Sequence, residues 1–305
     1  MTITRRCVLA AAALITFLVP TLLNADEGVP TGRDPFADWD MPDFMKHWEF
    51  GIDVEDEKAP HFFADIYLPL YESAKGSRTI FLEPRVVHFD GETLLNTGVG
   101  YRQLVNHNRW ILGANLFYDY ETEHAHDRIG PGVEALSAFA EFRANGYFGL
   151  SKARTVDPGI TANVIEKVVD GFDLEVGAPV PYYSRLKVFG GYEWYDFKQF
   201  ENREGWSTRA EYTPFRFIVI DVTLKDNNKR TTGWGVTVAF RPPFGENLST
   251  PDRPHRPLFK LDDRIFPDSN VEDRMTRLVE RHHDIVVERY QQLPGQVNIE
   301  IRRGT

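Results

Sequence analysis

The chain has a single cysteine and, beyond its N-terminal region, no long hydrophobic run. The cysteine, Cys7, lies close to the start of the 305 residues. No later stretch approaches the roughly 20 apolar residues that a membrane-spanning helix needs. The sequence therefore excludes a disulfide-stabilised scaffold and a helical membrane protein, but it leaves open a membrane protein built of strands.

Basic residues are also in deficit. The 35 Lys and Arg residues face 45 Asp and Glu residues, which gives a formal net charge of −10. A nucleic-acid partner is excluded on this ground, because binding phosphates needs a basic surface. Aromatic residues, in contrast, make up 13% of the chain, with 22 Phe, 12 Tyr and 6 Trp.

The first residues have the composition of a secretory signal peptide. Arg5 and Arg6 precede an apolar run from Cys7 to Leu23, and small Ala25 follows as a cleavage position. A retained membrane helix is the alternative, but Pro20 interrupts a run that is already short. We predict a signal peptide at 1–25, export of the chain, and a mature protein without cysteine.

The rest of the chain is dominated by segments in which apolar and polar residues alternate. This period of two is typical of strands with one apolar and one polar face. About twelve such segments occur: Trp48–Glu55, Phe62–Leu70, Ile80–Val86, Leu95–Arg102, Trp110–Asp119, Gly132–Ala135, Glu141–Phe148, Phe172–Ala178, Leu186–Trp194, Trp206–Tyr212, Ile218–Lys225 and Trp234–Phe240.

Three features favour a membrane barrel over a soluble β-sandwich. Aromatic residues stand at the ends of the apolar faces, as membrane-interface girdles require: Trp48, Trp110, Trp194, Trp206, Trp234 and Phe240. The polar faces carry glycines and charges of both signs, whereas a sandwich exterior would have fewer interior glycines. Connections such as 106–108 are short, while 121–127, 151–169 and 226–231 are longer, as expected for alternating turns and surface loops.

We therefore predict an all-β fold, a transmembrane antiparallel up-and-down barrel of about 12 strands. Charged residues on the polar faces would line its lumen. The predicted lumen-lining residues are Glu83, Arg85, Arg102, Glu141, Arg143, Glu175, Lys187, Arg209 and Glu211.

Several short motifs resemble the barrel domain of the intimin and invasin family, the inverse autotransporters. They include Gly98–Gln103, Trp110–Asp119, Ile129–Ala135 and Asn145–Phe148, and the resemblance runs in order from about Trp48 to Tyr290. It implies a twelve-stranded outer-membrane barrel whose pore holds a linker that leads to an extracellular passenger. In that family adhesion belongs to the passenger.

The residues after the last strand suit a plug. Prolines, which cannot pair in a sheet, crowd the segment 242–268, which we predict to be a connector. Ser269 or Asn270 could cap a helix that runs to about Arg281, followed by an extended segment. Because twelve strands enclose more space than their own side chains fill, we expect this helix and linker to occupy the pore. The predicted pore-linker residues are Arg277, Glu280, Arg281, Asp284 and Glu288. The alternative is an amphipathic helix in the periplasm.

Motifs for chemistry are weak. His124-x-His126-Asp127 offers suitable metal ligands, but residues two apart in a surface loop are more often solvated, and His282-His283 is no better. Ser137, Ser151 and Ser207 stand in no nucleophile motif. We predict no enzymatic activity, no catalytic residue, no metal site and no cofactor.

The predicted organisation is a signal peptide at 1–25, a short periplasmic segment at 26–46, a barrel at 47–241, the connector, and a linker at 269–305 with a candidate passenger strand near 296–301. The segment 26–46 has no room for the peptidoglycan-binding module of the resembling family, and we expect the passenger to be absent or separate. We expect a translocator or anchor in the outer membrane of a diderm bacterium. Its partners would be membrane lipids, the barrel assembly machinery and periplasmic chaperones. The alternative is a porin-like channel or a structural outer-membrane protein.

Overall fold

The structure, a computed structural model, describes residues 47–56, 58–158, 163–215, 217–241, 261–266, 271–293 and 297–300. The predicted signal peptide, the segment 26–46 and most of the connector 242–268 lie outside these residues. So do the expected helix caps Ser269 and Asn270.

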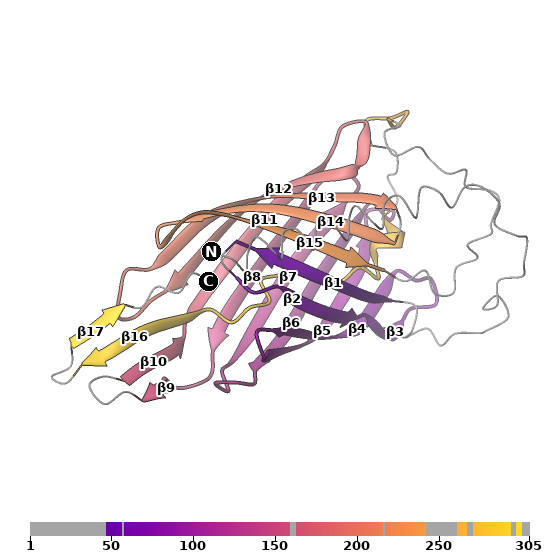
Figure 1. The fold of residues 1–305 in the computed structure, drawn as a ribbon. Coiled ribbons are helices and arrows are strands. Elements are labelled where there is room, and N and C mark those ends of the chain that lie inside the picture. The colour runs from indigo at the N-terminus through magenta and orange to yellow at the C-terminus, as the bar shows by residue number, and fades with distance from the viewer. Residues whose placement is uncertain are drawn as a thin grey trace, which may run out of the picture.

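Twelve antiparallel strands form a closed barrel, as the alternating pattern predicts (Figure 1). Strands β2 and β3 count as one barrel strand because both pair with β4. The ring closes where β1 pairs with β15, with Phe50 opposite Phe240, and with β2. The strands are β1 (Trp48–Glu55), β2 (His61–Ile66), β3 (Leu68–Glu72), β4 (Arg78–Phe89), β5 (Glu92–Val105), β6 (Trp110–Glu121), β7 (Asp127–Ser137), β8 (Glu141–Gly149), β11 (Asp170–Val180), β12 (Tyr183–Asp196), β13 (Arg203–Phe215), β14 (Ile218–Asn227) and β15 (Arg230–Phe240).

A second, four-stranded sheet projects from one end of the barrel (Figure 1). Its order is β17-β16-β10-β9, so it joins a hairpin from the barrel to two strands from the C-terminal part of the chain. The strands are β9 (Arg154–Pro158), β10 (Asn163–Val168), β16 (Val287–Leu293) and β17 (Val297–Glu300). We call this end of the barrel the sheet end, and the end where β1 begins and β15 stops the entry end.

The barrel wall is apolar outside and largely polar inside. In β6, Leu112, Leu116 and Tyr118 are 43–49% exposed, whereas Phe117 and Asp119, which alternate with them, are at most 1% exposed. An apolar outer surface is stable only where it faces lipid rather than water. The outward faces therefore form the membrane-contacting surface.

The predicted girdle residues fall at both ends of the barrel. Trp48 begins β1, Trp110 begins β6 and Phe240 ends β15, all at the entry end. Trp194, Trp206 and Trp234 lie toward the sheet end of β12, β13 and β15. Trp206 is 71% exposed and Phe240 is 45% exposed. These positions are compatible with the predicted girdles, because aromatic residues gather at the two interfaces of a bilayer.

Two expected connections differ from the prediction. The connection 226–231 is a tight turn, because β14 runs to Asn227 and β15 starts at Arg230, which leaves only Asn228 and Lys229. The connection 151–169, expected as a loop, contains the hairpin β9–β10. Paired edges there use backbone groups that a plain loop would leave to water.

The predicted helix ending near Arg281 is wrong. Within the described residues 271–281 one 3₁₀ turn forms, η3 (Glu272–Arg274), and the chain then has no regular helix as far as β16. Acidic residues at Glu272 and Asp273 suit a helix start locally, but side chains of the barrel wall bind the backbone groups that a helix would have paired internally. Over the described ranges, no helix has the length and hydropathy to cross a bilayer.

Candidate functional site in the barrel lumen

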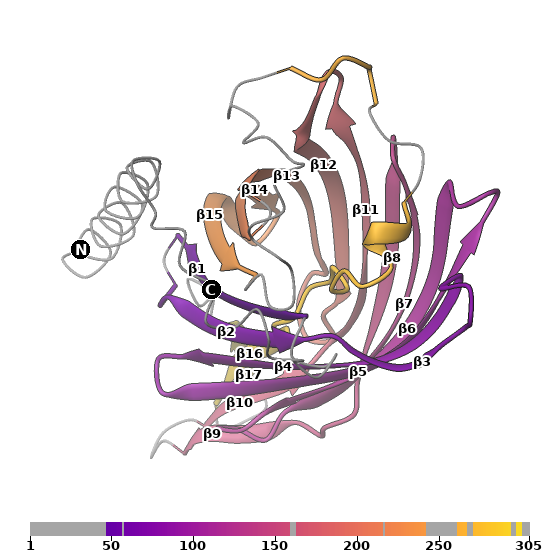
Figure 2. The same cartoon turned by 90° about the vertical axis from the view of Figure 1, so that its right-hand side faces the viewer.

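The segment 271–300, which we call the tail, starts at the entry end and finishes at the sheet end. At the entry end the Val271 amide donates to the Asn108 carbonyl at 3.0 Å, and the Arg274 guanidinium donates to the Ser137 carbonyl at 2.6 Å. Seen end-on, η3 and the segment after it lie inside the ring of strands (Figure 2). The tail therefore runs along the lumen rather than over the outer surface.

Side chains of β4 and β5 bind the tail's backbone near the entry end. Arg102 donates to the Met275 carbonyl at 3.0 Å and also to the Arg277 carbonyl. Both oxygens of Glu83 accept the Val279 amide, at 3.1 and 3.0 Å. Arg102 and Glu83 are completely buried. The extended chain thus has its buried backbone groups satisfied by wall side chains, which removes the need for a helix.

The same arrangement continues further along the lumen. The Tyr147 hydroxyl accepts the His282 amide at 2.8 Å, and Arg128 donates to the carbonyls of His282 and His283 at 2.6 and 3.0 Å. Asn96 also donates to the His283 carbonyl, at 3.3 Å. Four strands, β4, β5, β7 and β8, therefore hold consecutive parts of one extended segment.

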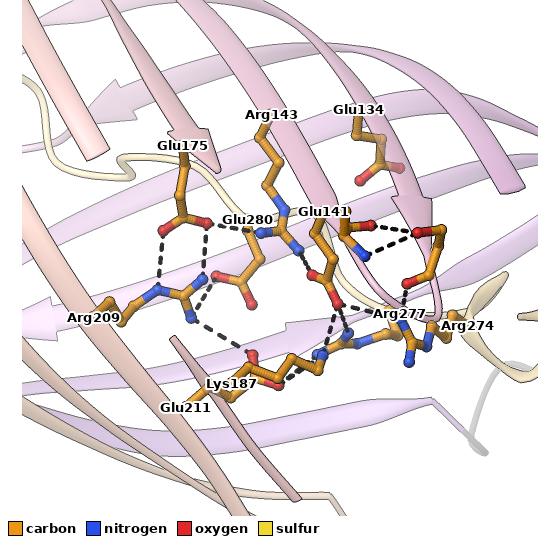
Figure 3. Close-up of polar contacts among 12 residues, drawn as sticks. Glu134, Glu141, Arg143, Glu175, Lys187, Arg209, Glu211, Arg274, Arg277 and Glu280 are labelled. Atoms are coloured by element: carbon orange, nitrogen blue, oxygen red, sulfur yellow. Dashed lines mark hydrogen bonds and ion pairs between the residues drawn. The ribbon is translucent and has the colours of Figure 1, made fainter. Parts of the chain in front are cut away.

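Glu141 is the centre of a buried ion network between wall and tail (Figure 3). Its carboxylate is completely buried and contacts Arg143, Lys187 at 2.8 Å, Arg274 at 3.3 Å and Arg277 at 3.4 Å. Two of these cations belong to the wall and two to the tail. In a site of low dielectric, four cations strongly favour the ionised form of the Glu141 carboxylate. The carboxylate in turn compensates part of the charge of each cation.

A second carboxylate, Glu211, shares this network. It lies 3.0 Å from Lys187, 3.0 Å from Arg277 and 3.6 Å from Arg209. Arg209 reaches Glu175 at 2.9 Å and Glu280 of the tail at 3.9 Å (Figure 3). The charges of both signs on the wall are therefore paired with each other and with the tail.

Two further ion pairs fix the tail toward the sheet end. Arg281 binds Asp119 of β6 at 2.7 Å, and Asp284 lies 3.2 Å from Lys58 in the β1–β2 connection. Burial would lower the pKa of Lys58, but the carboxylates of Asp284 and Glu55 outweigh it and hold that pKa above its usual value. Lys58 is therefore a cation throughout the neutral range.

Aromatic rings lie over the glycines of the inner face. An added Cβ at Gly98 would come within 2.4 Å of the Phe117 ring, and one at Gly100 within 2.2 Å of the Phe81 ring. Phe81 and Phe117 pack together with Val279 of the tail. The glycines thus make room for rings that form an apolar contact with the tail, a contact that the charge pattern did not predict.

At the sheet end the tail changes from side-chain to backbone contacts. Strand β16 pairs with β10 from Val287 opposite Val168 to Gln292 opposite Asn163. Next to it, the buried Glu288 carboxylate accepts the backbone amides of Lys198, Gln199 and Phe200 at 2.7–3.1 Å. The end of the described tail is therefore a strand of the outer sheet.

All nine predicted lumen-lining residues lie on the inner face. Five of them contact the tail directly: Glu83, Arg102, Glu141, Arg209 and Glu211. The other four are Arg85, Arg143, Glu175 and Lys187, and they form ion pairs within the wall. Arg85 pairs with Asp65, Glu175 pairs with both Arg143 and Arg209, and Lys187 pairs with Glu141. The predicted pore-linker residues Arg277, Glu280, Arg281, Asp284 and Glu288 each have one of the contacts above.

The sequence prediction left Asp119, Arg128 and Glu134 out of the lumen-lining residues, although Asp119 and Glu134 fall on the predicted polar faces. Arg128 pairs with Asp119 at 2.6 Å and Glu134 with Arg102 at 2.5 Å. Each continues the polar alternation of its strand, so extending the pattern of β7 back from Gly132 would have found Arg128.

Comparison with known proteins identifies the same kind of barrel. The family model described as inverse autotransporter, beta-domain, matches residues 41–283. The chain is 27% identical to an invasin of Yersinia enterocolitica over 289 residues, which is 83% of this chain and 32% of that protein. It is 26% identical to the inverse autotransporter adhesin YeeJ of Escherichia coli, over 63% of this chain and 8% of that protein.

A structure solved in work on the in-meso crystallization of membrane proteins has the same fold. It matches with a TM-score of 0.65 and 20% identity, over 80% of this chain and 99% of that one. The chain spans only about a third of the length of the invasin.

Proposed function

The chain belongs to the inverse autotransporter β-domain family, and from this premise we propose that it is an outer-membrane translocator or anchor whose lumen is occupied by its own tail. Outer-membrane localisation and contact with lipid follow from the family and the apolar outer face. The hydrogen bonds from Arg102, Glu83, Tyr147 and Arg128 to the tail's backbone are the observation that carries the proposal.

In this proposal the entry end faces the periplasm and the sheet end faces the outside. An export signal at 1–25, removed after Ala25, would deliver the chain to the periplasm, where β1 and the residues after β15 begin on the same side. The barrel comprises 47–241, the connector 242–268 returns to the lumen, and 269–305 leads outward. Barrel assembly machinery and periplasmic chaperones would be its partners during insertion.

The cargo of the proposed translocator is a passenger joined to or associated with the tail. The relatives with printed names are an invasin and an adhesin. We propose that any adhesive activity of this protein resides in such a passenger and that the barrel has no enzymatic activity. Glu141 and Glu211 support this, because both carboxylates are paired with cations instead of lying free in a cleft.

A porin-like channel is the second candidate. A cavity of about 270 Å³ lies beside the tail, lined by charged residues that include Asp53, Arg209, Asp221 and Lys225. Water and ions could pass there if the tail were displaced. The two candidates differ in whether the intact chain conducts.

Single-channel recording in planar lipid bilayers separates them. The full chain is expected to be silent, and a variant that ends at Phe244 is expected to conduct in steady steps, because removal of the tail opens the lumen. Large steady currents from the full chain would favour the channel. Silence from the truncated barrel, once it is shown to be folded and inserted, would contradict the proposed plug. Cysteines at Glu280 and Arg143, cross-linked in the membrane, provide an independent check of the tail's position.

A further inference from the structure

Four side chains with metal-binding atoms converge at the sheet end of the barrel. Glu121 ends β6, His124 and His126 stand in the β6–β7 connection, and Glu166 lies on β10. The Glu166 carboxylate is 3.1 Å from Nε2 of His126 and 3.5 Å from Nδ1 of His124. Ligand atoms of Glu121, His124 and His126 all lie within 4.8 Å of one another.

Burial separates this cluster from a solvated surface loop. His126 and Glu166 are each 2% exposed, so the expectation that this histidine is solvated is wrong. Within the described part of the chain, Nδ1 of His126 has no hydrogen-bond partner. A buried polar atom without a partner costs free energy, which a bound ligand can recover. Asp127, the third residue of the sequence motif, is not part of the cluster, because its carboxylate accepts the Tyr118 hydroxyl at 3.2 Å.

We propose that Glu121, His124 and Nδ1 of His126 form a binding site for one divalent cation of the zinc class, and that Glu166 orients His126 through its hydrogen bond to Nε2. Two imidazoles with one or two carboxylates are a ligand set that suits zinc and its first-row neighbours. Further carboxylates from Glu92 and Glu123 lie next to Glu121 and add to the negative potential.

Arg289 of the tail is a cation that contacts the cluster and has to be weighed against the site. It lies 3.1 Å from Oε1 of Glu166, whereas the two histidines face Oε2. The contact is an ion pair without a hydrogen bond, so Arg289 neutralises one carboxylate oxygen of Glu166 and leaves the other directed at the imidazoles. Glu121 is partly engaged as well, because it accepts the His124 amide at 3.1 Å, and we assign it the weakest ligand position.

The location gives the site a structural consequence. The β6–β7 connection belongs to the barrel, and Glu166 lies on β10 directly opposite Arg289 of β16. A cation bound there would fix His126, and the hydrogen bond from His126 to Glu166 would connect the barrel rim to the sheet that pairs with the tail. A cavity of about 490 Å³, lined by Glu121, His124, His126 and Glu166 among others, gives an ion access from the sheet end. Cation binding at this site would not require that the barrel transports a passenger.

Zinc binding to the full chain in detergent micelles tests the site. The protein is purified without a polyhistidine tag, stripped with a chelator and titrated with zinc chloride by calorimetry, with equilibrium dialysis for stoichiometry. One zinc per chain is expected, with affinity reduced at least about tenfold in His126→Gln and Glu166→Gln. His88→Ala is the matched control, because His88 is exposed on β4 and has no part in the cluster. It should bind like the wild type.

Folding is followed in parallel by heat-dependent gel mobility, and His124→Gln replaces any variant that does not fold, since His124 is only half-buried. Absence of stoichiometric zinc in the wild type would overturn the proposal. So would equal affinity in the cluster variants and His88→Ala, which would assign the zinc to a different place.

Discussion

The tail is held in two different ways along its length. Inside the lumen, from Met275 to Asp284, wall side chains bind its backbone and its charges, and no strand pairs with it. At the sheet end, β16 pairs with β10 residue by residue. Side-chain contacts require particular residues on the wall, whereas strand pairing requires only free backbone groups and correct register. The contacts inside the lumen therefore depend on the side chains of the wall and the tail, whereas the contacts with the outer sheet depend on backbone hydrogen bonds.

Among the substitutions that test this difference, removal of the Glu141 carboxylate is expected to lower the free energy of unfolding most. Glu141→Ala leaves Lys187, Arg143, Arg274 and Arg277 with less compensation in a buried site. We expect a loss of about 3–5 kcal/mol from the free energy of unfolding. Urea unfolding in micelles, followed by gel mobility, measures it.

Asp273→Ala is the charge-matched control, because Asp273 is an exposed tail residue beside the same network. It should change the free energy of unfolding by less than about 0.5 kcal/mol. Equal effects of the two substitutions would mean that the lumen does not recognise the tail through its charges.

Loss of one buried acceptor at the sheet end should have a smaller and more local effect. Glu288→Gln removes the charge that binds the amides of residues 198–200, and we expect a cost of about 1–3 kcal/mol. Hydrogen exchange should accelerate at these three amides and stay unchanged at Val279. Glu201→Gln, an exposed change in the same connection, should leave both unchanged. Faster exchange at Val279 would show that the two parts of the tail are not held independently.

A smaller effect is expected from crowding the inner face. Gly100→Ala would press on the Phe81 ring, which packs on Val279, and should cost about 1–2 kcal/mol. Gly190→Ala is the matched control on the outer face, where an added Cβ meets nothing within 4 Å. Thermal unfolding in micelles compares the two. If Gly190→Ala were the more destabilising, the ring–glycine contact would not support the tail.

The barrel could be predicted from the sequence because apolar outward residues alternate with inward residues along every barrel strand. Leu112, Leu116 and Tyr118 alternate with inward residues over a full strand, so the pattern accumulates over about ten positions. The wall residues of the site could be predicted for the same reason: Glu141 and Arg143 lie on the polar face of β8, where they alternate with apolar Phe142 and Ala144.

The tail's conformation could not be read in this way. Acidic residues at Glu272 and Asp273 are a local signal for a helix, but the hydrogen bonds that override it come from Arg102 and Glu83, about 170 to 200 positions away. The pairing of β16 with β10 and the hydrogen bond between His126 and Glu166 also depend on partners outside the local sequence. Local patterns contain no information about such contacts.

A disulfide between β10 and β16, formed in intact cells, tests the path of the tail most directly. Val164 lies directly opposite Gln291, so cysteines there are close enough to bond, whereas Ile299 is one strand further away and should not bond to position 164. In a Cys7→Ala background, we expect Val164→Cys with Gln291→Cys to form the bond in the outer membrane and Val164→Cys with Ile299→Cys to remain reduced. If the tail stayed in the periplasm, positions 164 and 291 would lie on opposite sides of the membrane. Absence of the bond in a correctly inserted barrel would then contradict passage of the tail through the lumen.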